Sequence, residues 1–211
     1  MKNFEKFEFQ SEKNKKERQP ELNEKEEELK RKKYEKEKRE EEKRVIDELI
    51  NSGLSFVLRG SWAGEIISGI PSKHKDIDIY VEEKDWDKVE RFLKEKKFDI
   101  EKTEGNKRII RKGKVCLDCH LWEEKENQYV EKTPYGTFYF PKEGVILVSY
   151  KNSSVRIMSP ELMWILKKGG PSLSPERERN LEKLLKFIDR KKLQEISKKF
   201  KYIPPSEKEE G

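Results

Sequence analysis

Three aspartates at alternating positions are the side chains of this chain best suited to chemistry. Asp76 and Asp78 are separated by one apolar residue, and Asp118 lies in a second alternating stretch. Because side chains alternate between the two faces of a strand, Asp76 and Asp78 are expected to share one face. If the strand of Asp118 is a neighbour, three carboxylates meet on one patch. Such a patch suits hard divalent cations such as Mg²⁺, and with them phosphoryl or nucleotidyl transfer.

A Gly-Ser step ahead of the aspartate pair has the features of a phosphate site. A short strand is expected over residues 54–58 and a helix over 62–68, with Gly60 allowing the tight turn between them. The N-terminus of a helix presents free backbone N–H groups and the positive end of the helix dipole, and both bind phosphate. The hydroxyl of Ser61 adds a further donor for a triphosphate oxygen.

These motifs resemble the nucleotidyltransferase superfamily, the fold shared by DNA polymerase beta, and in particular its lincosamide and aminoglycoside nucleotidyltransferase branch. That branch has a Gly-Gly/Ser-Trp step, a short helix, and a His two residues before Asp-Ile-Asp. The corresponding residues here are Gly60-Ser61-Trp62 and His74-Lys75-Asp76-Ile77-Asp78. Leu117-Asp118-Cys119-His120 is similar to the Val-Asp-Leu-His strand of the branch. The resemblance extends over about residues 45–190 and does not include the N-terminal extension or the C-terminal tail.

The resemblance implies an α+β fold, in which a mixed β-sheet is flanked by helices. A C-terminal helical segment and a long charged N-terminal helix complete the expected architecture. It also implies that Asp76 and Asp78 bind two Mg²⁺ ions, and that Asp118 is a third ligand or the general base. Gly60 and Ser61 would then bind the phosphates of the nucleotide.

The family often carries a basic residue on its first C-terminal helix, near the nucleotide phosphates. Lys167 is the best match for that residue, and Lys168 is its rival. A Lys-Asp pair further along in the family is replaced here by Arg179-Asn180, so no role is carried over to the second C-terminal helix.

The activity that the resemblance implies is transfer of a nucleoside monophosphate from an NTP, with ATP as the expected donor, to an acceptor hydroxyl. A small molecule such as a lincosamide or an aminoglycoside is the first choice of acceptor. Two alternatives stay open, namely a protein or tRNA acceptor, as in toxin–antitoxin pairs, and a non-catalytic nucleotide-binding scaffold. A homodimer is one option for the oligomeric state.

The histidines and cysteines allow several interpretations. His120 is expected either to orient Asp118 or contact a nucleotide, or to be a half-exposed strand residue. His74 is expected to be solvated or to approach phosphate. Cys116, Cys119 and His120 are crowded on one strand, with Cys119 on the opposite face, which disfavours zinc because structural zinc sites need four ligands at regular spacings. Trp62 is expected to be a packing residue.

Composition divides the chain unevenly. Of the 211 residues, 32% are hydrophobic and 44% are charged, and the charge is concentrated in residues 1–44. The net charge of +6 favours phosphate-bearing ligands but does not by itself indicate nucleic acid. Neither a membrane span nor a secretory leader is expected. Two cysteines on one strand suit a reducing compartment, so a cytoplasmic protein is expected.

We expect four segments along the chain. Residues 1–44 form a charged, solvated extension that is helical from about residue 21, where Pro20 can open a helix. The apolar residues just after it would pack the end of this helix on the core, and the extension itself is a solvated arm or binds a partner. The catalytic core is residues 45–158, the C-terminal helices are 159–200, and 201–211 is a flexible tail.

Capping signals place the C-terminal helices. Ser159-Pro160-Glu161 opens one helix, Gly169-Gly170 ends it, and Ser174-Pro175-Glu176 opens the next, which runs to about Ile188. A last helix is expected over residues 189–200. Beyond the first strand, strands are expected over residues 77–81, 98–101, 108–111, 114–122, 138–140, 145–148 and 155–158.

Overall fold

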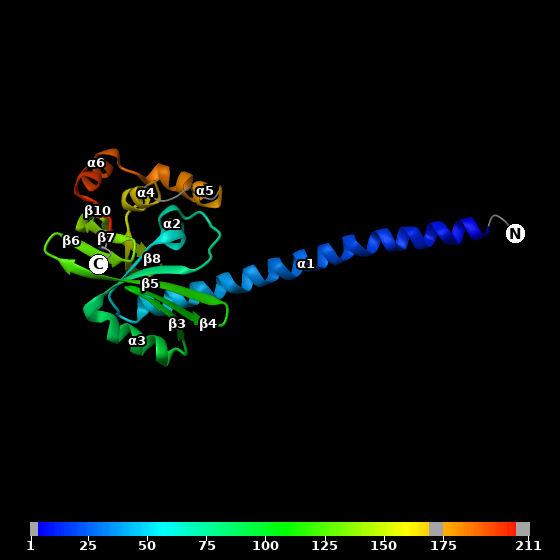
Figure 1. The fold of residues 1–211 in the computed structure, drawn as a ribbon, viewed down its shortest axis with the longest axis horizontal. Coiled ribbons are helices and arrows are strands. Elements are labelled where there is room, and N and C mark those ends of the chain that lie inside the picture. The colour runs from blue at the N-terminus through cyan, green and yellow to red at the C-terminus, as the bar shows by residue number, and fades with distance from the viewer. Residues whose placement is uncertain (1–3, 169–174, 206–211) are drawn as a thin grey trace, which may run out of the picture. The chain divides into compact units, whose positions relative to one another are not determined.

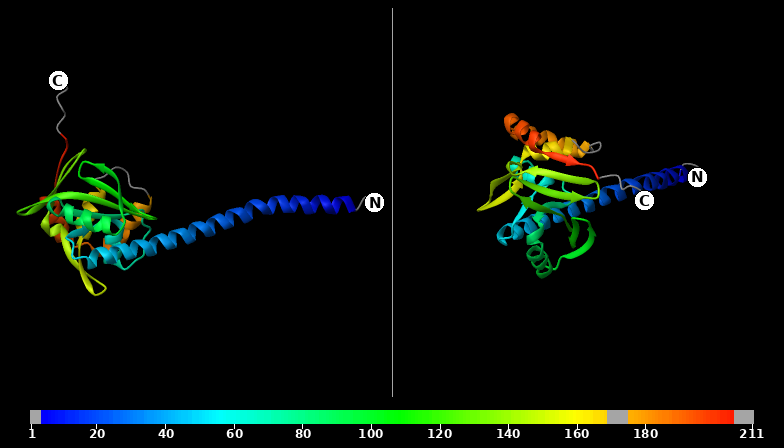
Figure 2. Two further views of the ribbon diagram at one scale, coloured as in Figure 1. Left: turned by 90° about the horizontal axis from the view of Figure 1, so that it is seen from below. Right: turned by 60° about the vertical axis from the view of Figure 1, so that its left-hand side comes forward.

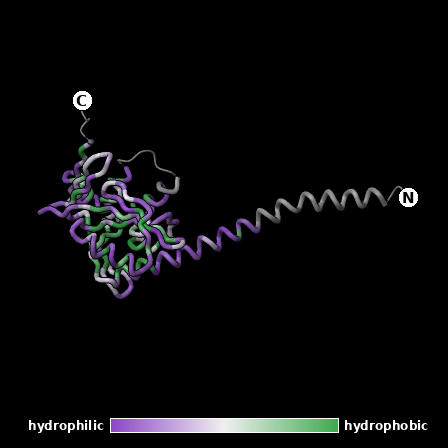
Figure 3. Tube along the Cα trace, turned by 60° about the horizontal axis from the view of Figure 1, so that its bottom comes forward, coloured by the Kyte–Doolittle hydropathy of each residue, from purple (hydrophilic) through white to green (hydrophobic). Residues whose placement is uncertain are grey.

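The computed structural model describes the backbone of residues 4–168 and 175–205 (Figure 1). Its contacts divide the chain into two compact units, Met1–Lys43 and Arg44–Gly211. Residues 26–43 of the first unit are mostly hydrophilic, whereas apolar segments gather inside the second unit (Figure 3). No helix in the described part of the chain is both long and apolar enough to cross a membrane.

Helix α1 spans Phe4–Asn51 and is therefore longer than predicted. The predicted start near residue 21 is wrong, because the helix passes through Pro20. Proline removes one backbone hydrogen bond there, but the surrounding Glu, Lys and Arg residues favour helix on both sides of it. Residues 26–37 are exposed, and i,i+4 ion pairs such as Lys32 with Glu28 (2.6 Å) lie along this part of the helix.

The last turns of α1, within the second unit, are amphipathic. Val45, Ile46 and Leu49 are buried in the hydrophobic core, and Ile50 packs against it. The prediction that this apolar cluster anchors the end of the helix on the core is confirmed.

The core of the second unit is one ten-stranded mixed sheet. Its order is β10-β7-β6-β5-β2-β1-β9-β8, and β4 and then β3 extend from β5. The pairs β2–β5 and β1–β9 are parallel, and the other pairs are antiparallel. The strands are β1 (Phe56–Leu58), β2 (Ile77–Glu82), β3 (Asp99–Glu104), β4 (Lys107–Lys112), β5 (Val115–Lys125), β6 (Gln128–Thr133), β7 (Gly136–Pro141), β8 (Val145–Tyr150), β9 (Ser153–Met158) and β10 (Lys201–Ile203).

Helices cover this sheet, which Figure 2 shows to be curled. In Figure 1, α2, α4, α5 and α6 lie on one side of the strands and α3 lies on the other. The mixed sheet flanked by helices, predicted from the sequence, is thus confirmed. The helices are α2 (Gly60–Ser68), α3 (Trp86–Glu95), α4 (Pro160–Lys168), α5 (Pro175–Leu184) and α6 (Arg190–Lys199).

Two strands are absent from the sequence prediction. β6 carries charged side chains, of which Lys132 pairs with Glu123 of β5 at 2.7 Å. These charges obscure the alternation of apolar and polar residues by which a strand is recognised in the sequence. β10 lies in the segment expected to be a flexible tail, and that prediction is wrong for Lys201–Ile203 because they pair with β7. Most of the other predicted strands are present but extend by one to three residues at an end.

The predicted helix start at Ser159 is confirmed. The hydroxyl of Ser159 accepts a hydrogen bond from the backbone N–H of Leu162 (3.3 Å), as expected of an N-cap. Helix α5 ends at Leu184, earlier than the predicted end near Ile188, and continues as a short 3₁₀ turn over Leu185–Phe187. The predicted stop at Gly169-Gly170 and the predicted cap at Ser174 lie outside the described residues.

Candidate active site

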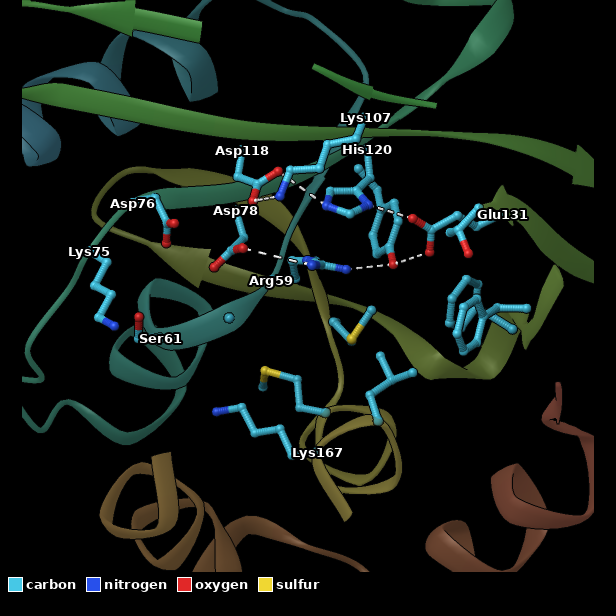
Figure 4. Close-up of a pocket in the computed structure, with 18 of the residues that line it drawn as sticks. Arg59, Ser61, Lys75, Asp76, Asp78, Lys107, Asp118, His120, Glu131 and Lys167 are labelled. Carbon is cyan, nitrogen blue, oxygen red and sulfur yellow. Dashed lines mark hydrogen bonds and ion pairs between the residues drawn. The ribbon is translucent and has the colours of Figure 1, made fainter. Parts of the chain in front are cut away.

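The parallel pairing of β2 with β5 brings the predicted carboxylates together. Asp78 and Asp118 are direct register partners on these neighbouring strands. Asp76 lies in the bend just before β2 rather than within it. All three carboxylates line one cavity of about 510 Å³, which is within the usual size range of small-molecule sites (Figure 4).

Gly60 and Ser61 line the same cavity and begin α2, two residues earlier than predicted. Gly60 has φ = +69°, a conformation that favours glycine. A Cβ atom at this position would lie 2.1 Å from Oδ2 of Asp78, so the site leaves no room for a side chain. The start of α2 therefore packs directly against Asp78 of β2, the strand predicted to bind a metal ion.

The structure distinguishes between the two rival lysines of α4. Lys167 lines the cavity, whereas Lys168 is exposed and its Nζ lies 5.1 Å from the ring centre of Trp164. From α5, to which the sequence assigned no role, Asn180 also lines the cavity. The second C-terminal helix therefore does contribute to this site.

Basic side chains that sequence reasoning missed lie against the predicted carboxylates. Arg59 Nη2 lies 3.7 Å from Oδ1 of Asp78, and Lys107 Nζ donates to Oδ2 of Asp118 at 2.5 Å. Arg59 directly precedes Gly60, so its position in the sequence was a signal. Lys107 could be found only from the register of β4 against β5, in which it lies opposite His120.

A chain of polar contacts extends from Asp118 across the floor of the cavity (Figure 4). Nε2 of His120 lies 3.1 Å from Oδ1 of Asp118, and Nδ1 of the same ring contacts Oε1 of Glu131. Tyr80 donates its hydroxyl proton to Oε2 of Glu131 (2.7 Å), and Arg59 Nη1 donates to the Tyr80 oxygen (2.6 Å). Of the alternatives left open for His120, the contact with Asp118 is the one that the structure has.

These contacts favour the charged forms of the buried groups. Burial acts to raise the pKa of Asp118, but the contact with His120 and the hydrogen bond from Lys107 lower it below its ordinary value. Burial likewise acts to raise the pKa of Glu131, but contact with His120 and the charge of Arg59 lower it. For His120, burial acts to lower the pKa, and the contact with Asp118 and the hydrogen bond to Glu131 raise it above its ordinary value.

The carboxylates fit a hard cation in kind, because Mg²⁺ binds oxygen ligands. In the described ranges, however, no three His, Cys, Asp or Glu side chains are grouped closely enough to hold a metal ion. The cause is visible in the contacts, since Asp78 lies against Arg59, and Asp118 lies against Lys107 and His120. A bound metal ion would replace these cationic side chains as the partner of the Asp78 and Asp118 carboxylates, which already line one cavity.

Other candidate residues are structural. The prediction that His74 is solvated or approaches phosphate is wrong, because its side chain is only 2% exposed. Its ring stacks on Trp62 with a centroid distance of 3.9 Å, and its Nε2 lies 2.8 Å from Oε2 of Glu65. The packing role predicted for Trp62 is confirmed. Cys116 is half-buried and Cys119 buried, as expected of residues on opposite faces of β5.

The Glu131 contacts predict a pH-dependent contribution to stability. We expect Glu131→Gln to lower the free energy of unfolding by about 2 kcal/mol at neutral pH, because it removes a buried charge that partners His120. Since the pKa of Glu131 is lowered on folding and that of His120 is raised, the difference between the two proteins should be largest between the ordinary value of 4.5 and the raised pKa of His120. It should decrease as the pH falls through the lowered pKa of Glu131 and as it rises through that of His120. Urea unfolding of both proteins in a chelating buffer measures it. A difference that stays constant down to acid pH would contradict the ionic role.

Comparison with known proteins agrees with this geometry. The model of the aminoglycoside-2''-adenylyltransferase family matches residues 43–179. The structure of lincosamide antibiotic adenylyltransferase LnuA, bound to lincomycin, is similar with a TM-score of 0.59 and 19% identity, over 69% of this chain and 94% of that one. The structure of ANT(2'')-Ia in complex with adenylyl-2''-tobramycin is similar with a TM-score of 0.56 and 14% identity, over 72% and 90%. No curated protein sequence gives a match.

Structural similarity at these low identities supports the fold alone. The match to the family model covers well over half of the chain. The chain belongs to the aminoglycoside-2''-adenylyltransferase family. The resemblance drawn from its motifs is confirmed.

Proposed function

We propose that this protein is a Mg²⁺-dependent nucleotidyltransferase that transfers a nucleoside monophosphate, with ATP as donor, to a hydroxyl group of a small molecule. The observation that carries the proposal is the register pairing of Asp78 with Asp118 in the cavity that Ser61 and Lys167 also line. Few other chemistries need a carboxylate cluster beside a helix N-terminus and a lysine, whereas a metal-bound triphosphate needs all of them.

Each side chain has a role in this proposal. Asp76 and Asp78 would hold Mg²⁺, which would neutralise phosphate charge, and Asp118 would be a third ligand that also accepts the proton of the acceptor hydroxyl. The backbone at Gly60, the Ser61 hydroxyl and the Lys167 ammonium bind the β- and γ-phosphates. The acceptor oxygen forms a bond to the α-phosphorus, the bond to the bridging oxygen breaks, and pyrophosphate leaves.

The relatives support a small acceptor and an adenylyl donor. ANT(2'')-Ia was solved with adenylyl-2''-tobramycin, and LnuA with lincomycin. The proposal is tested by incubating the chain with ATP, Mg²⁺ and a panel of hydroxyl-bearing small molecules, followed by mass spectrometry. The expected result is an acceptor heavier by one AMP unit and an equal amount of pyrophosphate. Hydrolysis of ATP without any adenylylated product would contradict the proposal.

The charged N-terminal arm gives a way to separate a small acceptor from a macromolecular one. Deleting residues 1–43 is expected to leave ATP binding, thermal stability and small-molecule turnover unchanged. The reason is that Arg44–Gly211 contains its own core, to which Val45, Ile46 and Leu49 belong. Thermal melts and turnover of the full and shortened chains provide the measurement. Loss of acceptor use with nucleotide binding retained would instead favour a protein or tRNA acceptor.

A further inference from the structure

The cavity has two chemically different halves. In Figure 4, Lys75, Asp76 and Ser61 lie toward the left and Glu131 lies at the right, with Asp78, Arg59 and His120 between them. The first side carries the groups proposed to bind the nucleotide and its metal. The second side is therefore the space that remains for an acceptor, beyond the Asp118 carboxylate.

Aromatic side chains line the cavity near Glu131. Glu131 of β6 pairs in register with Phe138 of β7, and the ring of Phe140 lies 5.6 Å from that of Tyr80, whose hydroxyl donates to Glu131. The other apolar side chains that line the cavity are Tyr135, Met158, Met163 and Leu166, of which Met163 and Leu166 lie on α4 with Lys167. A surface of this kind binds an apolar face, with a gain of about 25 cal/mol per Å² of apolar area that leaves water.

The carboxylates of the cavity are already engaged. Among the described residues that line it, five are Lys or Arg and four are Asp or Glu. Asp118 is held by Lys107 and His120, and Glu131 is held by His120 and Tyr80. Asp78 lies against Arg59. With a metal ion bound, the aspartates would be its ligands instead. In neither state do the described residues around Glu131 offer a carboxylate that is not already in a polar network.

We propose that the acceptor has an apolar face and carries no more than one positive charge, so that polycationic aminoglycosides are poor acceptors for this chain. This inference rests on the proposed function, and it narrows the acceptor class within a family named for aminoglycosides. An ammonium group that enters a cavity without a matching carboxylate loses hydration that nothing replaces. Several such groups on one molecule multiply that cost, whereas an apolar face with a hydroxyl avoids it.

The test compares two probes on the full chain saturated with Mg²⁺ and a non-hydrolysable ATP analogue. Lincomycin carries a single amine and tobramycin carries several, and calorimetry measures the affinity of each. We expect lincomycin to bind at least about tenfold more tightly at physiological salt, which is a difference of about 1.4 kcal/mol. Equal affinities, tighter binding of tobramycin, or binding of neither probe would overturn the inference.

Nucleotide binding is measured in the same samples, which keeps two failures apart. If the analogue binds but the acceptor order is not the expected one, only the acceptor class is wrong. If the analogue does not bind in the presence of Mg²⁺, the proposed function itself is wrong, and the inference falls with it.

Tyr135 offers a matched pair of variants. Its side chain lines the cavity, the residue is 78% exposed, and its recorded hydrogen bonds use backbone atoms, so substitution should not disturb folding. Tyr135→Glu and Tyr135→Gln both remove the ring and should weaken lincomycin binding. Because lincomycin carries one amine, its affinity should differ less between the two variants than that of tobramycin. Only Tyr135→Glu adds a carboxylate, and we expect it to bind tobramycin about three- to tenfold more tightly than Tyr135→Gln at low salt, with the gain reduced at high salt. Equal tobramycin affinities in the two variants would contradict the charge argument.

Discussion

Replacing either Asp76 or Asp78 with Asn is expected to lower nucleotidyl transfer by at least about a thousandfold, or about 4 kcal/mol of transition-state stabilisation. Asparagine keeps the shape of the side chain but removes the charge that would hold Mg²⁺ against the phosphates. The measurement is pyrophosphate release at saturating ATP and Mg²⁺. Normal turnover in both variants would end the assignment of these carboxylates.

The same substitutions should leave the protein folded. Asp78 is half-buried and its ion pair with Arg59 spans 3.7 Å, so losing the pair is expected to cost no more than about 1 kcal/mol. Asp87→Asn on α3 is a suitable control, because Asp87 is exposed and does not line the cavity. It should retain full turnover and an unchanged melting temperature. A collapse of the melting temperature in Asp78→Asn alone would show that its role is structural.

Gly60→Ala is the second substitution with a large expected effect. The new Cβ would lie 2.1 Å from Oδ2 and 2.9 Å from Cγ of Asp78, so either the carboxylate or the start of α2 must move. The positive φ of +69° adds about 1–2 kcal/mol of strain for any residue with a Cβ. We expect turnover to fall by at least about a hundredfold and the free energy of unfolding to fall by about 2 kcal/mol or more.

Gly69, at the other end of the same helix, is the matched control. It has φ = +66°, nearly the same backbone conformation, but a Cβ there would meet no atom within 4 Å. Gly69→Ala should therefore cost about 1 kcal/mol of stability through strain alone and leave turnover unchanged. Kinetics and urea unfolding of both variants separate the two effects. Similar activities in Gly60→Ala and Gly69→Ala would show that the contact with Asp78 does not matter for the reaction.

The placements that agree with the structure depend on local patterns. The period of two along a strand separates Cys116 from Cys119 on β5, whereas Asp76, which the same pattern places on a strand with Asp78, lies in the bend before β2. A glycine between a buried strand and a helix predicts the turn at Gly60 without knowledge of any neighbour. In each case the information lies within a few residues of the side chain concerned.

The side chains that were missed depend on contacts between distant segments. Lys107 reaches Asp118 because β4 pairs with β5 in one particular register, and Glu131 reaches His120 from the next hairpin. A shift of one residue in either pairing would turn these side chains to the other face, and the register of a pair cannot be read from the residues of one strand alone. Asn180 reaches the cavity only through the packing of the helices, as α2 contacts α5.

His74 shows the opposite error, in which a local reading is overruled by packing. It precedes the aspartate pair in a polar loop, where solvation or phosphate contact is the natural expectation. In the structure its ring is stacked on Trp62 and held by Glu65. The histidine of this motif therefore fixes the loop between α2 and β2 rather than facing the substrate.

The central claim is that the carboxylates and the Gly-Ser turn form a metal-dependent nucleotide site. The most direct measurement is calorimetric titration of ATP, GTP, CTP and UTP, each with and without Mg²⁺, into the native chain and the Asp76→Asn/Asp78→Asn double variant. The account predicts that ATP binds to the native chain in a Mg²⁺-dependent manner and that the double variant loses this binding. Absence of binding for all four nucleotides, or equal binding by the double variant, would contradict it.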